Sequence, residues 1–346
     1  MFGKTNVPRW SGDLQTYNEM FGTTNNPWDL TRTPGGSSGG AATAVASGFT
    51  SFELGTDIGG SVRMPAHLCG IFGLKPTYGI VSQRGYLDSV GGGTTDADIN
   101  AFGPLARSAD DLDLLLQITA GPNTTDAAAW SLQLPPSTTK PLNALRIGVW
   151  LDGDGAPPLA DDVRAVIENA IAALRDAGAH IEHVHPSIDF AKQRDLFFHL
   201  LTAATSPSMP YGDHDASGSH LEWLRAQQAR AALAASWHQW FDTFDALLCP
   251  VMTTAAFEHD NEIDFLSRTL TINGQARPHT DCVAWTGLIG VVGLPAAVPP
   301  IGRTAQGLPV GVQVVTAPFH DREAIRIAKL VSETCDGGYV IPRLMA

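Results

Sequence analysis

Two serines with glycine neighbours lie close together near the start of the sequence. Ser37 belongs to the stretch TPGGSSGG at residues 33–40, and Ser61 belongs to TDIGGSVRMP at residues 56–65. A serine hydroxyl can attack an acyl carbon when one group accepts its proton and others donate hydrogen bonds to the oxyanion. Glycines leave the backbone amides open to a substrate carbonyl, because no side chain covers them. The two stretches therefore favour acyl-transfer chemistry.

The segment DIGGS makes Ser61 the better candidate for the nucleophile. It places the backbone amides of Ile58, Gly59 and Gly60 directly before this serine, where they can form an oxyanion hole together with the serine amide. A Gly-Gly-Ser sequence on its own occurs in many loops, so the assignment depends on the surrounding motifs.

Three other interpretations of GGSSGG stay open but fit less well. A flexible linker is disfavoured because segments that are expected to fold flank the stretch on both sides. A phosphate-binding loop would need a lysine that this stretch lacks. Residues 36–40 also match Gly-x-Ser-x-Gly, which would make Ser38 the nucleophile, but that turn needs a buried strand before it. The preceding WDLTRTP is polar and ends in proline.

Composition and charge describe a globular chain that is unsuited to polyanionic partners. Of the 346 residues, 44% are hydrophobic and 16% are charged, and the formal net charge is −13. This charge disfavours nucleic acid and membrane as the main partners. The sequence has no signal-peptide pattern and no run of about 18 apolar residues. Four widely spaced cysteines predict reduced, mostly buried thiols in a cytoplasmic protein: Cys69, Cys249, Cys282 and Cys335.

Hydrophobic periodicity predicts an α/β fold. Residues 106–121 form an amphipathic pattern typical of a helix that Ser108 caps. A strand at 145–150, a helix at 159–179 and a strand at 180–185 form a strand–helix–strand unit. The other expected elements are a short strand before the Ser61 loop, strands within 70–82, at 246–252 and within 291–315, helices at 39–48 and 321–333, and a mostly helical region at 187–247 that breaks at 206–219.

Several long motifs in order resemble one known family. GKTN at residues 3–6, NNPWDLTRTPGGSSGG, LGTDIGGSVRMPA, CGIFGLKPTYGIVS, GPLARSADDL and GLPVGVQVV are together similar to the amidase signature family. The resemblance is densest over residues 3–120 and looser between 122 and 280. It implies a mixed β-sheet covered by helices on both faces, in a single domain over residues 1–346. It also implies hydrolysis of a small-molecule carboxylic amide through a serine acyl-enzyme, without a metal or organic cofactor.

The resemblance assigns roles to the residues around both serines. The family uses a Ser–cisSer–Lys triad, in which Ser61 matches the nucleophile. Ser37 matches the bridging serine, which follows a cis peptide bond and passes protons between the nucleophile and the base. The amides of the oxyanion hole match Ile58, Gly59 and Gly60, and the residues that support the loops match Asp57, Arg63 and Ser38.

The lysine of the family's triad has no counterpart in this sequence. It lies well upstream of GKTN, whereas this chain starts with MFGKTN. Lys4 and Lys75 belong to motifs in which the family's lysine is not the base. We therefore expect an N-terminally truncated amidase domain with exposed apolar faces, unpaired strand edges and little or no amidase activity. Two alternatives stay open: a non-catalytic fragment or degenerate binding protein, and an amidotransferase subunit that acts on charged tRNA with partner subunits. A homodimer is also considered.

Histidines offer a weaker alternative for the chemistry. HIEHVH at residues 180–185 suggests a metal site, but in a strand only His183 and His185 share a face. Exposed histidines on an edge strand are the favoured interpretation. His67 lies near Ser61 in the sequence, yet it is disfavoured as a general base.

Overall fold

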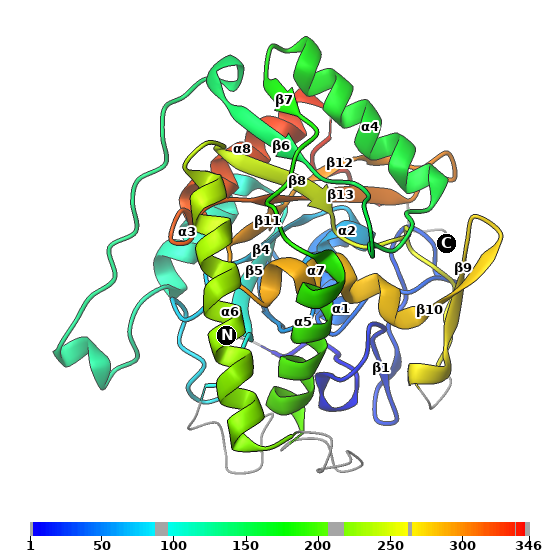
Figure 1. Ribbon diagram of the computed structural model, residues 1–346. Coiled ribbons are helices and arrows are strands. Elements are labelled where there is room, and N and C mark those ends of the chain that lie inside the picture. Colours follow the sequence, from blue (N-terminus) through cyan, green and yellow to red (C-terminus); the bar gives the residue numbers. More distant parts are fainter. Residues whose placement is uncertain (1–2, 87–95, 207–217, 262–264, 336, 343–346) are drawn as a thin grey trace.

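The chain is built around one large mixed β-sheet (Figure 1). The computed structural model describes residues 3–86, 96–206, 218–261, 265–335 and 337–342. Nine strands form this sheet in the order β3-β5-β4-β11-β13-β8-β6-β7, and β12 pairs with β13 beside that path. The strands of the sheet are β3 (Phe52–Asp57), β4 (Phe72–Lys75), β5 (Ala101–Ala106), β6 (Arg146–Val149), β7 (His180–Glu182), β8 (Ala246–Pro250), β11 (Ala296–Val298), β12 (Pro300–Arg303) and β13 (Pro309–Val315).

Helices cover both faces of the sheet, as expected for the α/β fold. The helices α3, α4 and α8 pack on one face, and α1 and α2 pack on the other, next to α7 (Figure 1). The helices are α1 (Gly39–Ala46), α2 (Arg63–Cys69), α3 (Ala109–Thr119), α4 (Asp161–Asp176), α5 (Phe190–Thr205), α6 (His220–Phe241), α7 (Ala284–Gly290) and α8 (Asp321–Thr334). Two small hairpins lie outside the sheet: β1 (Tyr17–Asn18) with β2 (Gly22–Thr23), and β9 (Thr269–Ile272) with β10 (Gln275–Pro278).

The predicted strand–helix–strand unit is confirmed. The strand β6 lies between β7 and β8 and runs parallel to both, while the other pairs of the large sheet are antiparallel. The connecting helix α4 buries an apolar stripe that includes Val163, Ile167, Ile171 and Leu174. These apolar residues recur about once per helical turn, and this spacing is the pattern that predicted the helix from the sequence.

The predicted capping of α3 is also confirmed. The Ser108 side chain accepts a hydrogen bond from the Asp111 amide at 3.1 Å. Two aspartates occupy the first helical turn, where the helix dipole favours negative charge. The buried side of the helix consists of Leu112, Leu115 and Leu116 with Ala109.

Other elements differ from the sequence-based expectation. The strand expected at 180–185 ends at Glu182. The strand β5, the short helices α2 and α7, and the β9–β10 hairpin were not predicted. The expected break at 206–219 falls largely on residues 207–217, which lie outside the described residues.

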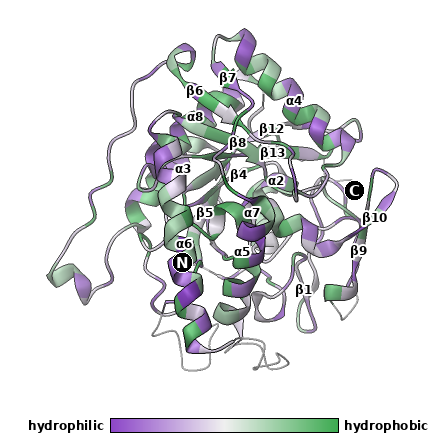
Figure 2. Cartoon of the chain, in the orientation of Figure 1, coloured by the Kyte–Doolittle hydropathy of each residue, from purple (hydrophilic) through white to green (hydrophobic). Residues whose placement is uncertain are grey.

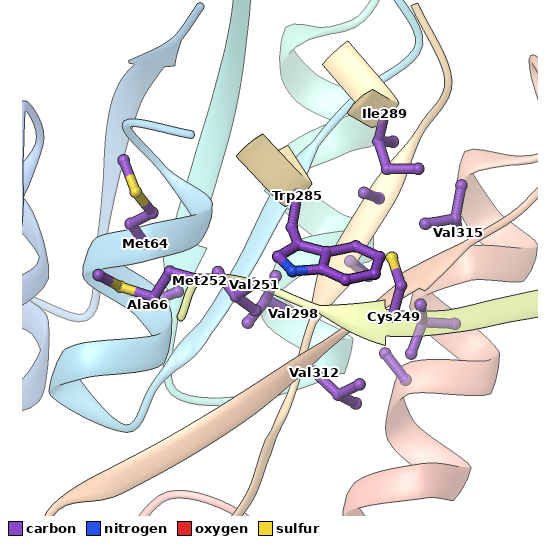
Figure 3. Packing of buried hydrophobic residues seen from close by; sticks show 14 of the residues in the cluster. Met64, Ala66, Cys249, Val251, Met252, Trp285, Ile289, Val298, Val312 and Val315 are labelled. Atoms are coloured by element: carbon purple, nitrogen blue, oxygen red, sulfur yellow. The ribbon is translucent and has the colours of Figure 1, made fainter. Parts of the chain in front are cut away.

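The apolar interior follows the strands, which Figure 2 shows as the hydrophobic centre of the molecule. Figure 3 shows Trp285 and Ile289 of α7 among residues of the central strands, with the Trp285 ring beside Cys249. Cys69, Cys249 and Cys282 are buried free thiols, as predicted, and Cys335 is partly exposed. Burial raises the pKa of the Cys282 thiol to about 12, so this group stays protonated.

No helix in the described ranges is both long and apolar enough to span a bilayer.

Candidate active site

Ser61 lies in a tight loop between β3 and α2. The strand ends at Asp57 and the helix begins at Arg63, so residues 58–62 alone connect strand and helix. Gly60 in this loop has φ +116°, a value that side chains other than glycine rarely allow. A Cβ atom at this position would also lie 2.6 Å from the Thr286 hydroxyl oxygen. The glycine before Ser61 is therefore required by both the turn and its close packing.

Ser37 lies in a second loop, which leads into α1. The peptide bond between Gly36 and Ser37 is cis. Gly36 packs against the backbone of residues 13–15, where a Cβ would lie 2.5 Å from the Asp13 carbonyl oxygen. The Thr16 hydroxyl donates to the Gly35 carbonyl at 2.8 Å and accepts from the Gly39 amide at 3.1 Å. One threonine from an early segment thus fixes both ends of the loop.

The two serine loops are in direct contact. The Ser38 amide donates a hydrogen bond to the Ser61 carbonyl at 3.1 Å. Both Ser37 and Ser61 are largely buried, with 2% and 7% of their surface exposed. Within the residues that the structure describes, no lysine, histidine or carboxylate side chain is hydrogen-bonded to either hydroxyl.

Asp57 and Arg63 form a buried ion pair beneath the nucleophile loop. The guanidinium donates two hydrogen bonds to the carboxylate, from Nη2 to Oδ1 at 2.7 Å and from Nε to Oδ2 at 2.9 Å. Both side chains are fully buried. Burial alone would raise the pKa of the Asp57 carboxyl, but the charge and hydrogen bonds of Arg63 outweigh it, so the pKa is lowered.

The pair connects the loop to two more distant elements. Arg63 Nη1 donates to the Thr286 carbonyl of α7 at 2.9 Å and to Gln313 Oε1 of β13 at 2.7 Å. Gln313 in turn donates to the Pro250 carbonyl of β8 at 2.7 Å. The loop that carries Ser61 is therefore supported by a continuous buried network.

The backbone amides of the nucleophile loop divide into two groups. The Gly60 amide donates to Asp57 Oδ1 at 2.8 Å, and the amides of Val62 and Arg63 donate to Oδ2 at 3.2 Å. In the described part of the chain, the amides of Ile58, Gly59 and Ser61 donate no turn, loop or side-chain hydrogen bond. These three amides remain available to a ligand.

The chain matches the model of one protein family over most of its length. The model of the amidase family matches residues 1–215 and 207–325. This chain belongs to the amidase signature family.

Relatives and solved structures of this amidase family align with almost the whole chain. One such relative, a component of the glutamyl-tRNA(Gln) amidotransferase of Picosynechococcus sp., is 29% identical over 96% of this chain and 74% of its own length. The crystal structure of the corresponding component from Thermotoga maritima has a TM-score of 0.82 at 27% identity, over 99% of this chain and 76% of that one. A 6-aminohexanoate cyclic dimer hydrolase has a TM-score of 0.79 at 25% identity, over 99% and 77% of the two chains.

His67 has a structural role in this chain. Its buried ring accepts a hydrogen bond from the Gly311 amide at Nδ1 (2.9 Å), and its Nε2 lies 3.2 Å from the Thr254 carbonyl oxygen, to which it donates. A ring that accepts at one nitrogen and donates at the other is neutral. Burial lowers its pKa, which keeps it so.

The histidines of residues 180–185 do not gather into a metal site. His185 stacks on Trp150 with ring centroids 4.1 Å apart, and His183 lies 3.4 Å from Arg175. In the described ranges, no group of three or more potential ligands is placed to hold a metal ion.

A cavity of about 530 Å³ lies between the start of α3 and the end of α8. Neither Ser37 nor Ser61 lines this cavity.

Lys75 is a buried titratable side chain that interacts electrostatically with Asp57 and Arg63. It lies at the end of β4 with 1% of its surface exposed, and its Nζ donates to the Pro76 carbonyl at 2.7 Å. Burial and the charge of Arg63 lower its pKa to about 7, although Asp57 and Asp321 act in the opposite direction. The Lys75 side chain therefore titrates near neutral pH.

Lys75 is expected to make the stability of the protein depend on pH. An unfolded lysine ionises near pH 10.4, so between about pH 7 and 10 the unfolded chain binds more protons than the folded chain. The free energy of unfolding should rise with pH in this range, by up to about 1.4 kcal/mol per unit. In Lys75→Met this contribution is absent, so the wild-type advantage over the variant should increase from pH 7 to pH 9.

Urea unfolding at pH 7, 8 and 9 measures this difference directly. The matched control is Lys192→Met, since the Lys192 side chain is 85% exposed and its removal should leave the pH dependence unchanged. A constant difference between wild type and Lys75→Met across the three pH values would contradict the prediction.

Three supporting residues were missed by the sequence analysis: Thr16, Thr286 and Gln313. Thr16 and Thr286 lie in segments without a distinguishing pattern. Gln313 carried a signal, because it is the only polar side chain within the apolar strand PVGVQVV. A buried polar residue in a central strand requires a partner, and here that partner is Arg63.

Proposed function

We propose that this chain cleaves the C–N bond of a carboxylic amide through an acyl-enzyme on Ser61. The observation that carries the proposal is the contact between the two serine loops, in which the Ser38 amide donates to the Ser61 carbonyl at 3.1 Å. Ser37, a second buried serine, directly precedes Ser38 in the contacting loop, which supports its proposed role as a proton relay. Membership of the amidase signature family supports the same reaction class.

In the proposed reaction, the Ser61 oxygen attacks the amide carbon while its proton passes to the Ser37 hydroxyl. The carbonyl oxygen becomes an oxyanion, which the free amides of Ile58, Gly59 and Ser61 stabilise. We assign the amide of Gly60 to Asp57 rather than to the oxyanion, because it already donates there. The C–N bond then breaks, and the leaving nitrogen takes a proton relayed by Ser37. Water attacks the resulting ester, releases the acid and restores the Ser61 hydroxyl.

We propose that turnover by this chain is slow. A proton relay accelerates the attack only when a base completes it. Neither serine hydroxyl has a hydrogen-bonded base among the residues described above. Ser61 and Ser37 would then rely on the oxyanion site and on water, so acylation is expected to be faster than background but far below the rate of an assisted serine.

A second function concerns the fate of the released nitrogen. The relatives that are components of a glutamyl-tRNA(Gln) amidotransferase favour transfer of the amide nitrogen to an acceptor over its release to water. Since those relatives are subunits, this chain would also work with partner chains. The formal net charge of −13 disfavours direct contact between this chain and tRNA, so a partner would hold that acceptor. Of the two functions, the comparisons support the amidotransferase component better than an independent hydrolase.

The test is to incubate the protein with a panel of primary carboxamides and to measure ammonia and carboxylic acid. The panel should include aliphatic amides, aromatic amides, and the free amino acids asparagine and glutamine. Hydroxylamine is then added to intercept the acyl-enzyme as a hydroxamate. We expect slow, equimolar formation of acid and ammonia, and hydroxamate at the expense of acid.

Absence of ammonia, acid and any acyl adduct on Ser61 would refute the proposed reaction. To distinguish the two fates of the nitrogen, the other subunits of the amidotransferase from a relative's organism are added together with the charged-tRNA acceptor. If the chain co-elutes with them and the amide nitrogen appears on the acceptor in place of free ammonia, the amidotransferase function is supported. Unchanged release and separate elution support the independent hydrolase.

A further inference from the structure

The side chain of Thr286 on α7 contacts the loop that carries Ser61. Its hydroxyl oxygen lies 2.7 Å from the Gly59 carbonyl oxygen and 3.2 Å from the Val283 carbonyl oxygen within its own turn. Two oxygens without a shared proton would repel each other at 2.7 Å, so the hydroxyl must donate to Gly59. Thr286 therefore directs its hydrogen bond out of its own helix and into the nucleophile loop.

The same peptide unit is held from its other end by Asp57. The Gly60 amide, which donates to Asp57 Oδ1 at 2.8 Å, belongs to the same planar group as the Gly59 carbonyl. A hydroxyl on one side and a carboxylate on the other thus fix one peptide plane. Both supporting side chains are fully buried.

This plane separates the amides that are proposed to bind the oxyanion. The Gly59 amide precedes it and the Ser61 amide follows it. Glycine allows a wide range of backbone angles, so an unsupported Gly59–Gly60 unit could rotate and turn its carbonyl oxygen towards the oxyanion. A carbonyl oxygen in that place would repel the developing negative charge. The orientation of the plane therefore decides whether the site attracts or repels an oxyanion.

The position of Thr286 is itself fixed by the buried ion pair. Its backbone carbonyl accepts a hydrogen bond from Arg63 Nη1 at 2.9 Å. Its side chain fits closely against Gly60, where an added Cβ would lie 2.6 Å from the hydroxyl oxygen. The hydroxyl is thus anchored to the element that it supports, and it can restrain the peptide plane without moving away.

We propose that Thr286 is a positioning residue that orients the Gly59–Gly60 peptide plane so that the flanking amides can bind an oxyanion. This inference rests on the proposed function, because it names the side chain that keeps the oxyanion site of that reaction in order.

The experiment compares Thr286→Val, which keeps the shape but removes the hydroxyl, with Thr286→Ser, which keeps the hydroxyl. The first readout is the rate at which a serine-reactive fluorophosphonate labels Ser61, because its phosphoryl oxygen occupies the oxyanion site. We expect Thr286→Val to lower this rate about 10- to 100-fold, since small misplacements of oxyanion donors cost this much. Thr286→Ser should stay within about threefold of wild type, because it restores the hydrogen bond.

The second readout is hydrogen exchange of the peptide that contains residues 58–64, measured by mass spectrometry. Thr286→Val should exchange faster there, while Thr286→Ser should resemble wild type. The matched control is Thr316→Val, because Thr316 is also buried and its hydroxyl donates to the His320 carbonyl at 3.0 Å, away from the serines. This control should change neither the labelling rate nor the exchange of residues 58–64.

The outcomes separate this inference from the proposed function. Labelling and loop exchange equal to wild type in Thr286→Val would overturn the inference while the proposed function stands. A wild-type protein that takes no label at Ser61 and hydrolyses no amide would contradict the proposed function. In that case the exchange readout still decides whether Thr286 fixes the loop, and unchanged exchange would overturn the inference as well.

Discussion

Replacement of Ser61 by alanine is expected to remove all covalent labelling by a fluorophosphonate and all amide cleavage. The reason is that the Ser61 oxygen is the atom on which the proposed acyl-enzyme forms. Removal of the nucleophile in serine hydrolases costs about 10⁴-fold or more. Mass spectrometry of the labelled protein checks this, with label on the peptide of the wild type that contains Ser61 and none in Ser61→Ala.

Ser37→Ala should behave differently from Ser61→Ala. It should lower the labelling rate only about twofold to tenfold, because the relay adds little to the attack when no base completes it and the nucleophile stays in place. The residual label should still be on Ser61. Ser332→Ala is the matched control, since this buried hydroxyl donates to the Pro300 carbonyl at 2.8 Å, far along the chain from both loops. Label that persists in Ser61→Ala, or a Ser37→Ala protein as fast as wild type, would count against the assigned roles.

The second large effect is expected on stability, from the buried pair of Asp57 and Arg63. Arg63→Met leaves the Asp57 carboxylate buried without its cation and leaves Gln313 Oε1 without its donor. Breaking a buried pair in this way costs about 3–5 kcal/mol of unfolding free energy. The double variant Asp57→Asn with Arg63→Met should recover part of this loss, because no unpaired charge then remains.

Urea unfolding at pH 7 provides the measurement. The control is Arg322→Met, which removes a partly exposed ion pair between Arg322 and Asp113 and should cost at most about 1 kcal/mol. If Arg63→Met unfolds within about 1 kcal/mol of wild type, the buried network does not support the loop as described. If it is strongly destabilised and the double variant is worse still, the backbone bonds of Asp57 matter more than its charge.

The sequence predicted the elements whose patterns are local. The helices α3, α4 and α8 carry regular apolar spacing, and Ser108 caps α3 as expected. The strand β5 was missed because AFGPLA contains a glycine and a proline, which normally argue against a strand. In the fold, a Cβ at Gly103 would overlap the Leu74 carbonyl oxygen, so the glycine permits close approach of β5 to its neighbour. That reason depends on strand pairing, which a single segment does not reveal.

The candidate site could be predicted only in part for the same reason. Ser37 and Ser61 could be proposed as site residues because they lie in recognisable motifs near each other in the sequence. Thr16 and Thr286 support those motifs from segments that are distant in the sequence and have no pattern of their own. Their importance follows from contacts with single carbonyl oxygens of Gly35 and Gly59, which only the folded chain brings near.

The hydrogen bond from Arg63 to Gln313 has a consequence for biosynthesis. These residues are 250 positions apart, so the arginine leaves the ribosome long before its partner is translated. Until β13 emerges, the guanidinium lacks one of its acceptors and the nucleophile loop lacks the strand that supports it. A chain synthesised only up to residue 300 thus contains both serines but lacks the strand from which Gln313 supports the nucleophile loop.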